Sequence, residues 1–152
     1  MKLAFAGSPE IRATREEVWR RLLDPHFIGS STPGVESVEI TGPNRFRMHL
    51  GFGVALLKLN FAMDVGFHDI VELESARMEA RGTATGTTVA MDSRIRIEEH
   101  DPQLQRLHWN AETRVDGALA GVGSMLVEGV ARKFTERFWD DFAERVEREA
   151  GR

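Results

Sequence analysis

The last third of the chain combines a strand-like segment, a glycine cluster and one long amphipathic helix, and this combination restricts the fold more than any other feature. Between Thr113 and Phe142 the sequence passes from a β-type pattern through Gly117, Gly121 and Gly123 into the helix. Apolar residues recur there at helical spacing, at Val122, Met125, Leu126, Val130, Phe134, Phe138, Phe142 and Val146. Such a stripe indicates that one helix face is buried. Because most of the preceding chain reads as strands, a sheet is the expected partner of that face.

Six segments between Val35 and Val115 alternate apolar and polar residues with a period of two. Consecutive strands with short connections predict an antiparallel meander that is apolar on one face and polar on the other. Ser93 and Thr113 are the clear polar members of the inward set. Its apolar members are Val38, Ile40, Phe46, Met48, Leu50, Leu57, Leu59, Phe61, Met63, Met78, Val89, Met91, Ile95, Leu107 and Trp109.

The N-terminal segment predicts one strand and two short helices. Residues 2–12 read as the strand, and Thr14 and Glu17 form a capping box at the start of the first helix. That helix ends at Asp24-Pro25, and residues 26–31 form a second helical turn. The predicted order is therefore β-α-α-β-β-β-β-β-β-α in one domain, residues 1–152. This is an α+β helix-grip fold, in which a curved antiparallel sheet wraps around the long C-terminal helix.

Composition excludes several classes of function. A net charge of −4 leaves no basic surface for nucleic acid, and there is no polybasic tract for an anionic membrane, so at most peripheral membrane contact is expected. The chain has no cysteine and no His-x-x-x-His spacing, so we expect no metal site. The N-terminus lacks a signal-peptide core. These features predict a cytoplasmic, soluble protein.

Three sequence motifs carry a resemblance to a known family. Residues 13–25 follow the pattern A-x-x-x-x-V-W-x-x-L-x-D-P, which resembles the opening of START-like domains of the polyketide cyclase superfamily. The P-G-V-E element within residues 32–36 and the V-x-G-x-L-A-x-x-G element at residues 115–123 are similar to those of CoxG. CoxG is the small accessory protein encoded with molybdenum carbon monoxide dehydrogenases. The resemblance extends over nearly the whole chain.

The sequence departs from that family at a few places. Trp109 stands where Tyr is more common, and Ser31 where Cys is frequent. Many relatives continue into a C-terminal extension, whereas this sequence stops at Arg152, just past the helix. The extension is the segment expected to support membrane recruitment.

A binding site is predicted between the apolar sheet face and the helix. Met side chains adapt to irregular ligands, and Trp109 could stack on a ring. The predicted ligand-binding residues are Phe46, Met48, Leu59, Phe61, Met63, Met78, Met91, Trp109, Val122, Met125 and Leu126. The predicted pocket mouth consists of Pro33, Gly34, Gly117, Gly121 and Gly123. The simpler alternative is that these residues only pack together and leave no cavity.

The resemblance implies a non-enzymatic protein that binds a hydrophobic small molecule. It implies association with a carbon monoxide dehydrogenase-type molybdenum hydroxylase at the inner face of the membrane. The ligand would be a quinone or isoprenoid lipid that connects the enzyme to its membrane electron acceptor, with no covalent or metal cofactor.

Two other functions remain open at this point. An enzyme of the polyketide cyclase/dehydrase type would need polar groups inside the cavity, for which His68, Ser93 or Thr113 are the candidates. A protein-interaction module without a ligand would need a large apolar patch outside the barrel, around Phe52–Leu56 or Trp139.

Overall fold

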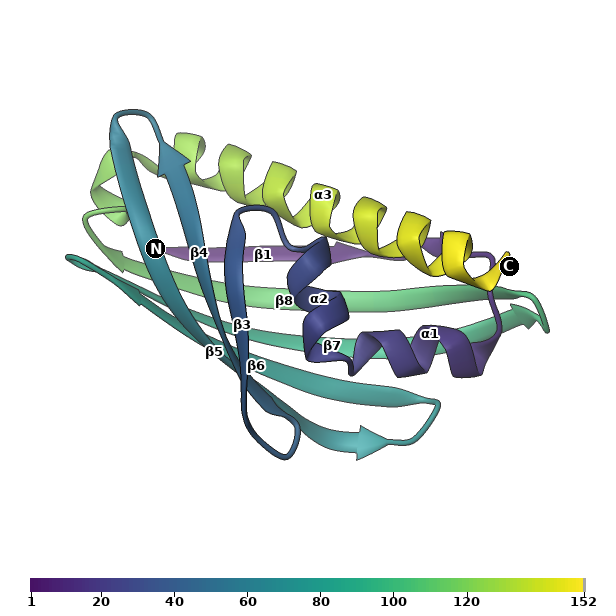
Figure 1. The fold of residues 1–152 in the computed structure, drawn as a ribbon. Coiled ribbons are helices and arrows are strands. Elements are labelled where there is room, and N and C mark those ends of the chain that lie inside the picture. The colour runs from purple at the N-terminus through teal and green to yellow at the C-terminus, as the bar shows by residue number, and fades with distance from the viewer. Residues whose placement is uncertain (152) are drawn as a thin grey trace.

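Figure 1 shows a computed structural model of the chain, which describes residues 1–151. One curved antiparallel sheet, in the order β1-β8-β7-β6-β5-β4-β3, wraps against a long C-terminal helix. The predicted helix-grip fold is confirmed. The elements are β1 Lys2–Gly7, β2 Glu10–Ile11, α1 Arg15–Leu22, α2 Pro25–Ser31, β3 Val35–Gly42, β4 Arg45–Val54, β5 Leu57–Val71, β6 Ser75–Ala84, β7 Thr87–Asp101, β8 Leu104–Gly117, the 3-10 turn η1 Ala120–Val122 and α3 Ser124–Ala150.

The predicted N-terminal strand is divided in two. β1 pairs with β8 from Lys2 to Gly7, and β2 pairs with β8 again at Glu10 and Ile11. Pro9 lies between them and has no N–H to donate to a ladder. Its carbonyl oxygen instead accepts a hydrogen bond from the Leu107 N–H at 2.9 Å. The chain therefore stays attached to β8 while it turns toward α1.

Side chains cap both short helices at their N-termini. Thr14 Oγ1 accepts from the Glu17 N–H at 3.2 Å, as the capping box predicts, but Glu17 makes no return bond and its Oε2 is buried without a partner. The reciprocal half of the predicted capping box is therefore wrong. Asp24 Oδ1 accepts from the N–H groups of His26 and Phe27 at the start of α2. These caps satisfy amide groups that the helices leave unpaired.

The sheet register follows the predicted alternation except at its edge. Phe46, Met48 and Leu50 point inward from β4 and are buried, whereas the residues between them are exposed. Ile40, which the alternation also predicts to face inward, is 58% exposed. It lies on the edge strand β3, directly before a register shift between Ile40 and Gly42. Such an irregularity bends an edge strand away from its neighbour, so Ile40 does not reach the core.

Helix α3 buries a different face at its N-terminal end from the one predicted. The apolar stripe predicts a helix that continues back through the glycines, but residues 120–122 form a separate 3-10 turn and Gly123 has φ +124°. The helix begins only at Ser124, so its buried face starts at Val127. Met125 and Leu126 are 89% and 45% exposed. Within residues 1–151, no helix has both the length and the hydrophobicity needed to cross a membrane.

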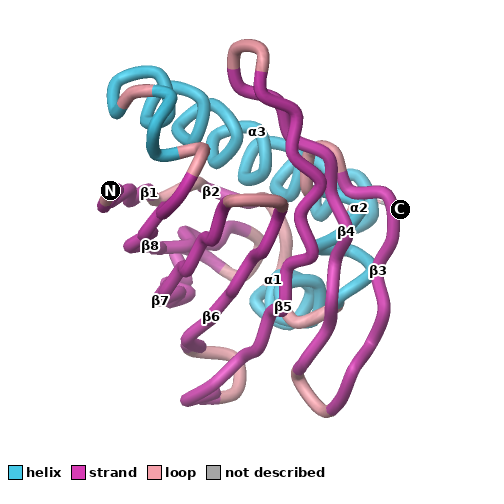
Figure 2. The backbone as a smooth tube through the Cα atoms, turned by 90° about the vertical axis from the view of Figure 1, so that its left-hand side faces the viewer, coloured by secondary structure: helices cyan, strands magenta, loops and turns pink. Residues whose placement is uncertain are grey.

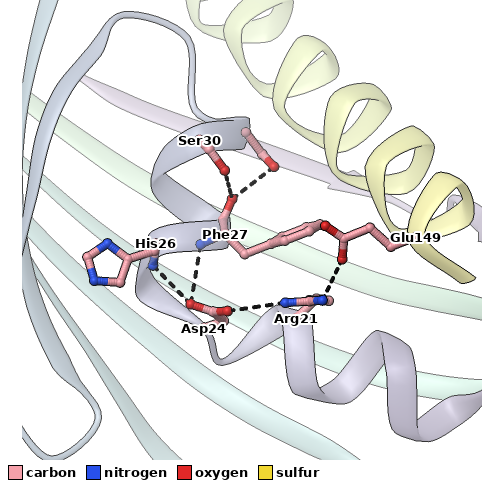
Figure 3. A network of polar contacts seen from close by, with 7 residues as sticks. Arg21, Asp24, His26, Phe27, Ser30 and Glu149 are labelled. Carbon is pink, nitrogen blue, oxygen red and sulfur yellow. Dashed lines mark hydrogen bonds and ion pairs between the residues drawn. The ribbon is translucent and has the colours of Figure 1, made fainter.

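The C-terminal half of α3 is tied to the two short helices. Figure 3 shows Arg21 between α1 and α3, where its Nη2 lies 2.5 Å from Glu149 Oε2. The guanidinium groups of Arg21 and Arg145 both lie against the Phe27 ring, at 5.1 and 4.9 Å from its centroid. Phe142 packs edge-on against the same ring at 5.4 Å. These contacts fix the end of α3 that is remote from the glycine cluster.

Candidate ligand-binding cavity

A cavity of about 240 Å³ lies between the concave face of the sheet and the middle of α3. It lies toward the N-terminal half of the helix, which contributes Val127, Ala131, Phe134, Thr135, Phe138 and Trp139 to the wall. The remaining lining residues are Leu3, Phe5, Ile28, Thr32, Phe46, Met48, Leu50, Phe52, Phe61, Met63, Val65, Met78, Ala80, Val89, Met91, Ser93, Trp109, Ala111, Thr113, Val115 and Leu119.

The cavity wall offers very little polarity. In the part of the chain that the structure describes, no Asp, Glu, Lys, Arg or His lines it. Ser93 Oγ donates to the Asn110 carbonyl at 2.7 Å, and Thr135 Oγ1 donates to the Ala131 carbonyl at 2.8 Å. Thr32 bonds to a backbone carbonyl in the same way, and Thr113 is the other hydroxyl in the wall. An occupant would therefore be held mainly by apolar contact.

Two tryptophans form one side of the cavity. Trp109 from β8 and Trp139 from α3 stack with ring centroids 5.5 Å apart and an interplanar angle of 20°. One face of Trp109 is thus covered, so a ligand ring has only the remaining surface of the pair to contact. β1 also passes close behind this ring, because a Cβ atom on Gly7 would lie 2.7 Å from Trp109 Nε1. The position of Trp109 is consequently fixed from two sides.

The predicted ligand-binding residues divide into two groups. Phe46, Met48, Phe61, Met63, Met78, Met91 and Trp109 all line the cavity. Four others lie outside it. Leu59 and Val122 pack in a second apolar cluster with Val54, while Met125 and Leu126 are exposed because α3 begins later than predicted. Whether any of these residues binds a ligand stays a prediction.

None of the five predicted mouth residues lines the cavity. Gly34 has φ +80° and its carbonyl accepts from the Gly51 N–H at 3.0 Å, so it serves the turn into β3 and a close approach to β4. Gly117 has φ +93° at the end of β8. Pro33, Gly121 and Gly123 likewise belong to connecting segments beside the cavity. Their chain neighbours Thr32 and Leu119 are the residues that reach the cavity.

Several residues line the cavity without having been predicted from the sequence. Leu3 and Phe5 alternate along β1, and this pattern is a signal that places them on the inner face. Val127 and Ala131 follow at helical spacing once the helix is started at Ser124. Phe52 lies in a Gly-Phe-Gly segment that is typical of a break, although β4 continues through it. Ile28 comes from the short helix α2, for which a single turn gives no usable periodicity.

Charged groups pair across strands on the outer face of the sheet. Arg77 Nε on β6 donates to Asp92 Oδ1 on β7 at 2.9 Å, and this hydrogen bond holds the pKa of the Asp92 carboxyl below its ordinary value. His68 lies on the same face, with its Nε2 3.6 Å from Glu79 Oε2. Within residues 1–151, no three His, Asp or Glu side chains gather where they could hold a metal ion. The titratable groups and the cavity are on opposite sides of the sheet.

Gly117→Ala should destabilise the protein by about 2–4 kcal/mol, since a side chain at φ +93° is strained and its Cβ would overlap the Gly86 carbonyl oxygen. The matched control is Gly121→Ala, whose Cβ would meet no atom within 4 Å. It should change stability by less than about 0.5 kcal/mol. Urea denaturation followed by circular dichroism measures both. Equal effects would mean that the turn at Gly117 is not what requires glycine.

Sequence comparison identifies the family. A profile of CoxG, described as a family of carbon monoxide dehydrogenase subunits, matches residues 7–147. The chain belongs to the CoxG family. No curated protein matches the sequence significantly.

Solved structures similar to this CoxG protein share its fold. A conserved protein from Geobacillus kaustophilus superposes with a TM-score of 0.88 at 23% identity, covering 96% of each chain. The Zhui aromatase/cyclase from Streptomyces sp. R1128 has a TM-score of 0.72 at 16% identity, covering 97% of this chain and 95% of its own. A START superfamily protein from Mycobacterium smegmatis has a TM-score of 0.73 at 14% identity, covering 95% and 97%. At these identities the likeness shows the START-like fold alone.

Proposed function

We propose that this protein is a non-enzymatic carrier that encloses part of a hydrophobic small molecule between its sheet and α3. The observation that supports the proposal is the wall of the 240 Å³ cavity, which is apolar and free of titratable side chains among residues 1–151. Burial of apolar surface is the interaction such a wall provides, at about 25 cal/mol per Å² removed from water.

The size of the cavity favours a ligand that is only partly enclosed. Pockets for drug-sized ligands usually span ~300–1,000 Å³, and this cavity is smaller. A quinone ring with the first part of its isoprenoid chain is the ligand we propose. Met48, Met63, Met78 and Met91 line the cavity and can change rotamer to admit it. The rest of the chain would leave the cavity along an apolar path.

The partner we propose is a carbon monoxide dehydrogenase-type molybdenum hydroxylase. Membership of the CoxG family supports this step, because the family is described as a subunit of carbon monoxide dehydrogenase. In this role the protein would link the enzyme to a lipophilic electron acceptor at the inner face of the membrane.

The enzymatic alternative has one observation in its favour and one against it. Ser93 and Thr113 both line the cavity, and one similar structure is an aromatase/cyclase. However, neither hydroxyl has a neighbouring base among the lining residues that the structure describes, and Ser93 already donates to a backbone carbonyl. The third candidate, His68, is on the outer face beside Glu79. A general base or acid would have to reach the substrate directly or through one water.

Native mass spectrometry of protein purified gently from its own host, followed by organic extraction, tests the carrier proposal. We expect a bound quinone or isoprenoid lipid. A titration with menadione or ubiquinone-1, followed by quenching of tryptophan fluorescence, tests binding directly because Trp109 and Trp139 line the cavity. A protein that is purified empty and also fails to bind either quinone would refute the proposal.

A further inference from the structure

Three segments that are far apart in the sequence meet at one end of the molecule. They are the tip of the β4–β5 hairpin (residues 50–57), the turn between β6 and β7 (residues 82–91) and the connection from β8 into α3 (residues 117–127). Thr87 pairs with Gly117, and the Ala118 N–H donates to the Gly86 carbonyl at 2.7 Å, so the last two segments touch. Val54 and Val127 belong to one apolar cluster, which joins the hairpin to the helix.

These three segments carry no charged side chain, and we call the surface they form the uncharged end. None of them contains Asp, Glu, Lys, Arg or His, in a chain of which 29% of residues are charged. The opposite end is different, because the β5–β6 turn contains Asp69, Glu72 and Glu74 and the β7–β8 turn is also acidic. Charged side chains are therefore distributed unevenly along the length of the molecule.

The uncharged end also exposes large apolar side chains. Leu56 at the tip of the hairpin is fully exposed, and Met125 is 89% and Leu126 45% exposed on the first turns of α3. Figure 2 faces this end and shows the hairpin tip and the start of α3 on the two sides of it. Between them lie Phe52 and Phe134, whose rings contact edge-on at 5.8 Å and which both line the cavity. The exposed side chains are thus continuous with the cavity wall.

We infer that the uncharged end docks on the hydrocarbon of a lipid bilayer, with Leu56, Met125 and Leu126 inserted, and that the cavity exchanges its ligand there. A bilayer fits better than a protein surface because insertion needs apolar side chains and no charged groups, and charged side chains that could pair with a partner are absent from these segments within the described residues. The inference rests on the proposed function for the ligand that is exchanged, but the docking itself can be tested without one.

Co-flotation with phosphatidylcholine vesicles tests the docking. We expect the protein to float with neutral vesicles, with little dependence on salt or on added phosphatidylserine, because no cationic residue lies in the three segments. Leu56→Asp and Met125→Asp should each lower the vesicle partition coefficient by at least about tenfold. Ile40→Asp is the matched control, since Ile40 is equally apolar and 58% exposed but lies away from this end. It should leave partitioning unchanged.

A second measurement does not depend on charged substitutions. The chain contains no cysteine, so Leu56→Cys can be labelled alone with an environment-sensitive dye. Its emission should shift to the blue with vesicles, whereas that of labelled Ile40→Cys should not. The inference is overturned if the protein does not float, if it binds only anionic vesicles at low salt, or if all three Asp variants lose binding equally. It is also overturned if Leu56→Asp weakens binding to a purified carbon monoxide dehydrogenase and leaves vesicle binding intact.

Failure of the docking and failure of the carrier proposal give different results. Leu56→Asp should still bind menadione from solution, because Leu56 does not line the cavity. Quinone binding without flotation would overturn the docking alone. Flotation without any quinone binding would overturn the carrier proposal and support the docking surface.

Discussion

Phe142→Ala is expected to lower the free energy of unfolding by about 3–5 kcal/mol, the range for removal of a fully buried aromatic side chain. Phe142 is 0% exposed and is in contact with the rings of Phe27, Phe138 and Trp139. Its loss would open a void where α3 meets α2. For a domain of this length we expect the melting temperature to fall by roughly 10 °C.

Leu126→Ala on the same helix is the matched control for Phe142→Ala. Both positions belong to the apolar stripe seen in the sequence, but Leu126 is 45% exposed. Its truncation should cost less than about 0.5 kcal/mol. Urea denaturation followed by circular dichroism would compare the two variants with the wild type. If they were destabilised equally, the burial of α3 described above would be wrong.

Ala131→Phe is expected to weaken the binding of menadione by at least about 100-fold, or roughly 2.8 kcal/mol. Ala131 lies on α3 and contributes to the cavity wall, so a phenyl ring at this position would occupy space that the ligand needs. The fold should tolerate the change, because the added ring enters an existing cavity and does not displace a well-packed core.

Ala90→Phe provides the control, since Ala90 lies on the outer face of β7 opposite Arg81 and Arg114. It should leave the dissociation constant unchanged. Tryptophan quenching reports binding for both variants, and thermal denaturation shows whether each remains folded. Unchanged affinity in a folded Ala131→Phe variant would place the quinone site elsewhere.

Period-two alternation is enough to predict the sheet, because each strand has one face against the core. The inward positions of β4 through β8 follow directly from residues such as Phe46, Phe61 and Trp109. The edge strand β3 is less predictable, since only one neighbour holds it and the bulge after Ile40 is set by twist rather than by local sequence.

The candidate site is predictable only in part because helical phase cannot be carried through glycine. The stripe from Phe134 to Val146 places the C-terminal half of α3 correctly, but Gly123 resets the chain direction and moves Met125 and Leu126 to the surface. The stack of Trp109 on Trp139 joins two elements that the sequence separates, and no periodicity within either element predicts it. Contacts of that kind depend on how the helix is placed over the sheet.

The pairing of β1 with β8 has a consequence for how the chain folds during synthesis. Lys2 pairs with Arg114, and the amino group of Met1 donates to the Val115 carbonyl, 114 residues away. β1 therefore has no partner until β8 has left the ribosome, and Leu3 and Phe5 stay without the core that they later join. Loop closure over such a distance makes this edge of the sheet slow to form. We expect the β3–β8 meander to assemble first, and the nascent chain to be most prone to aggregation before β1 joins it.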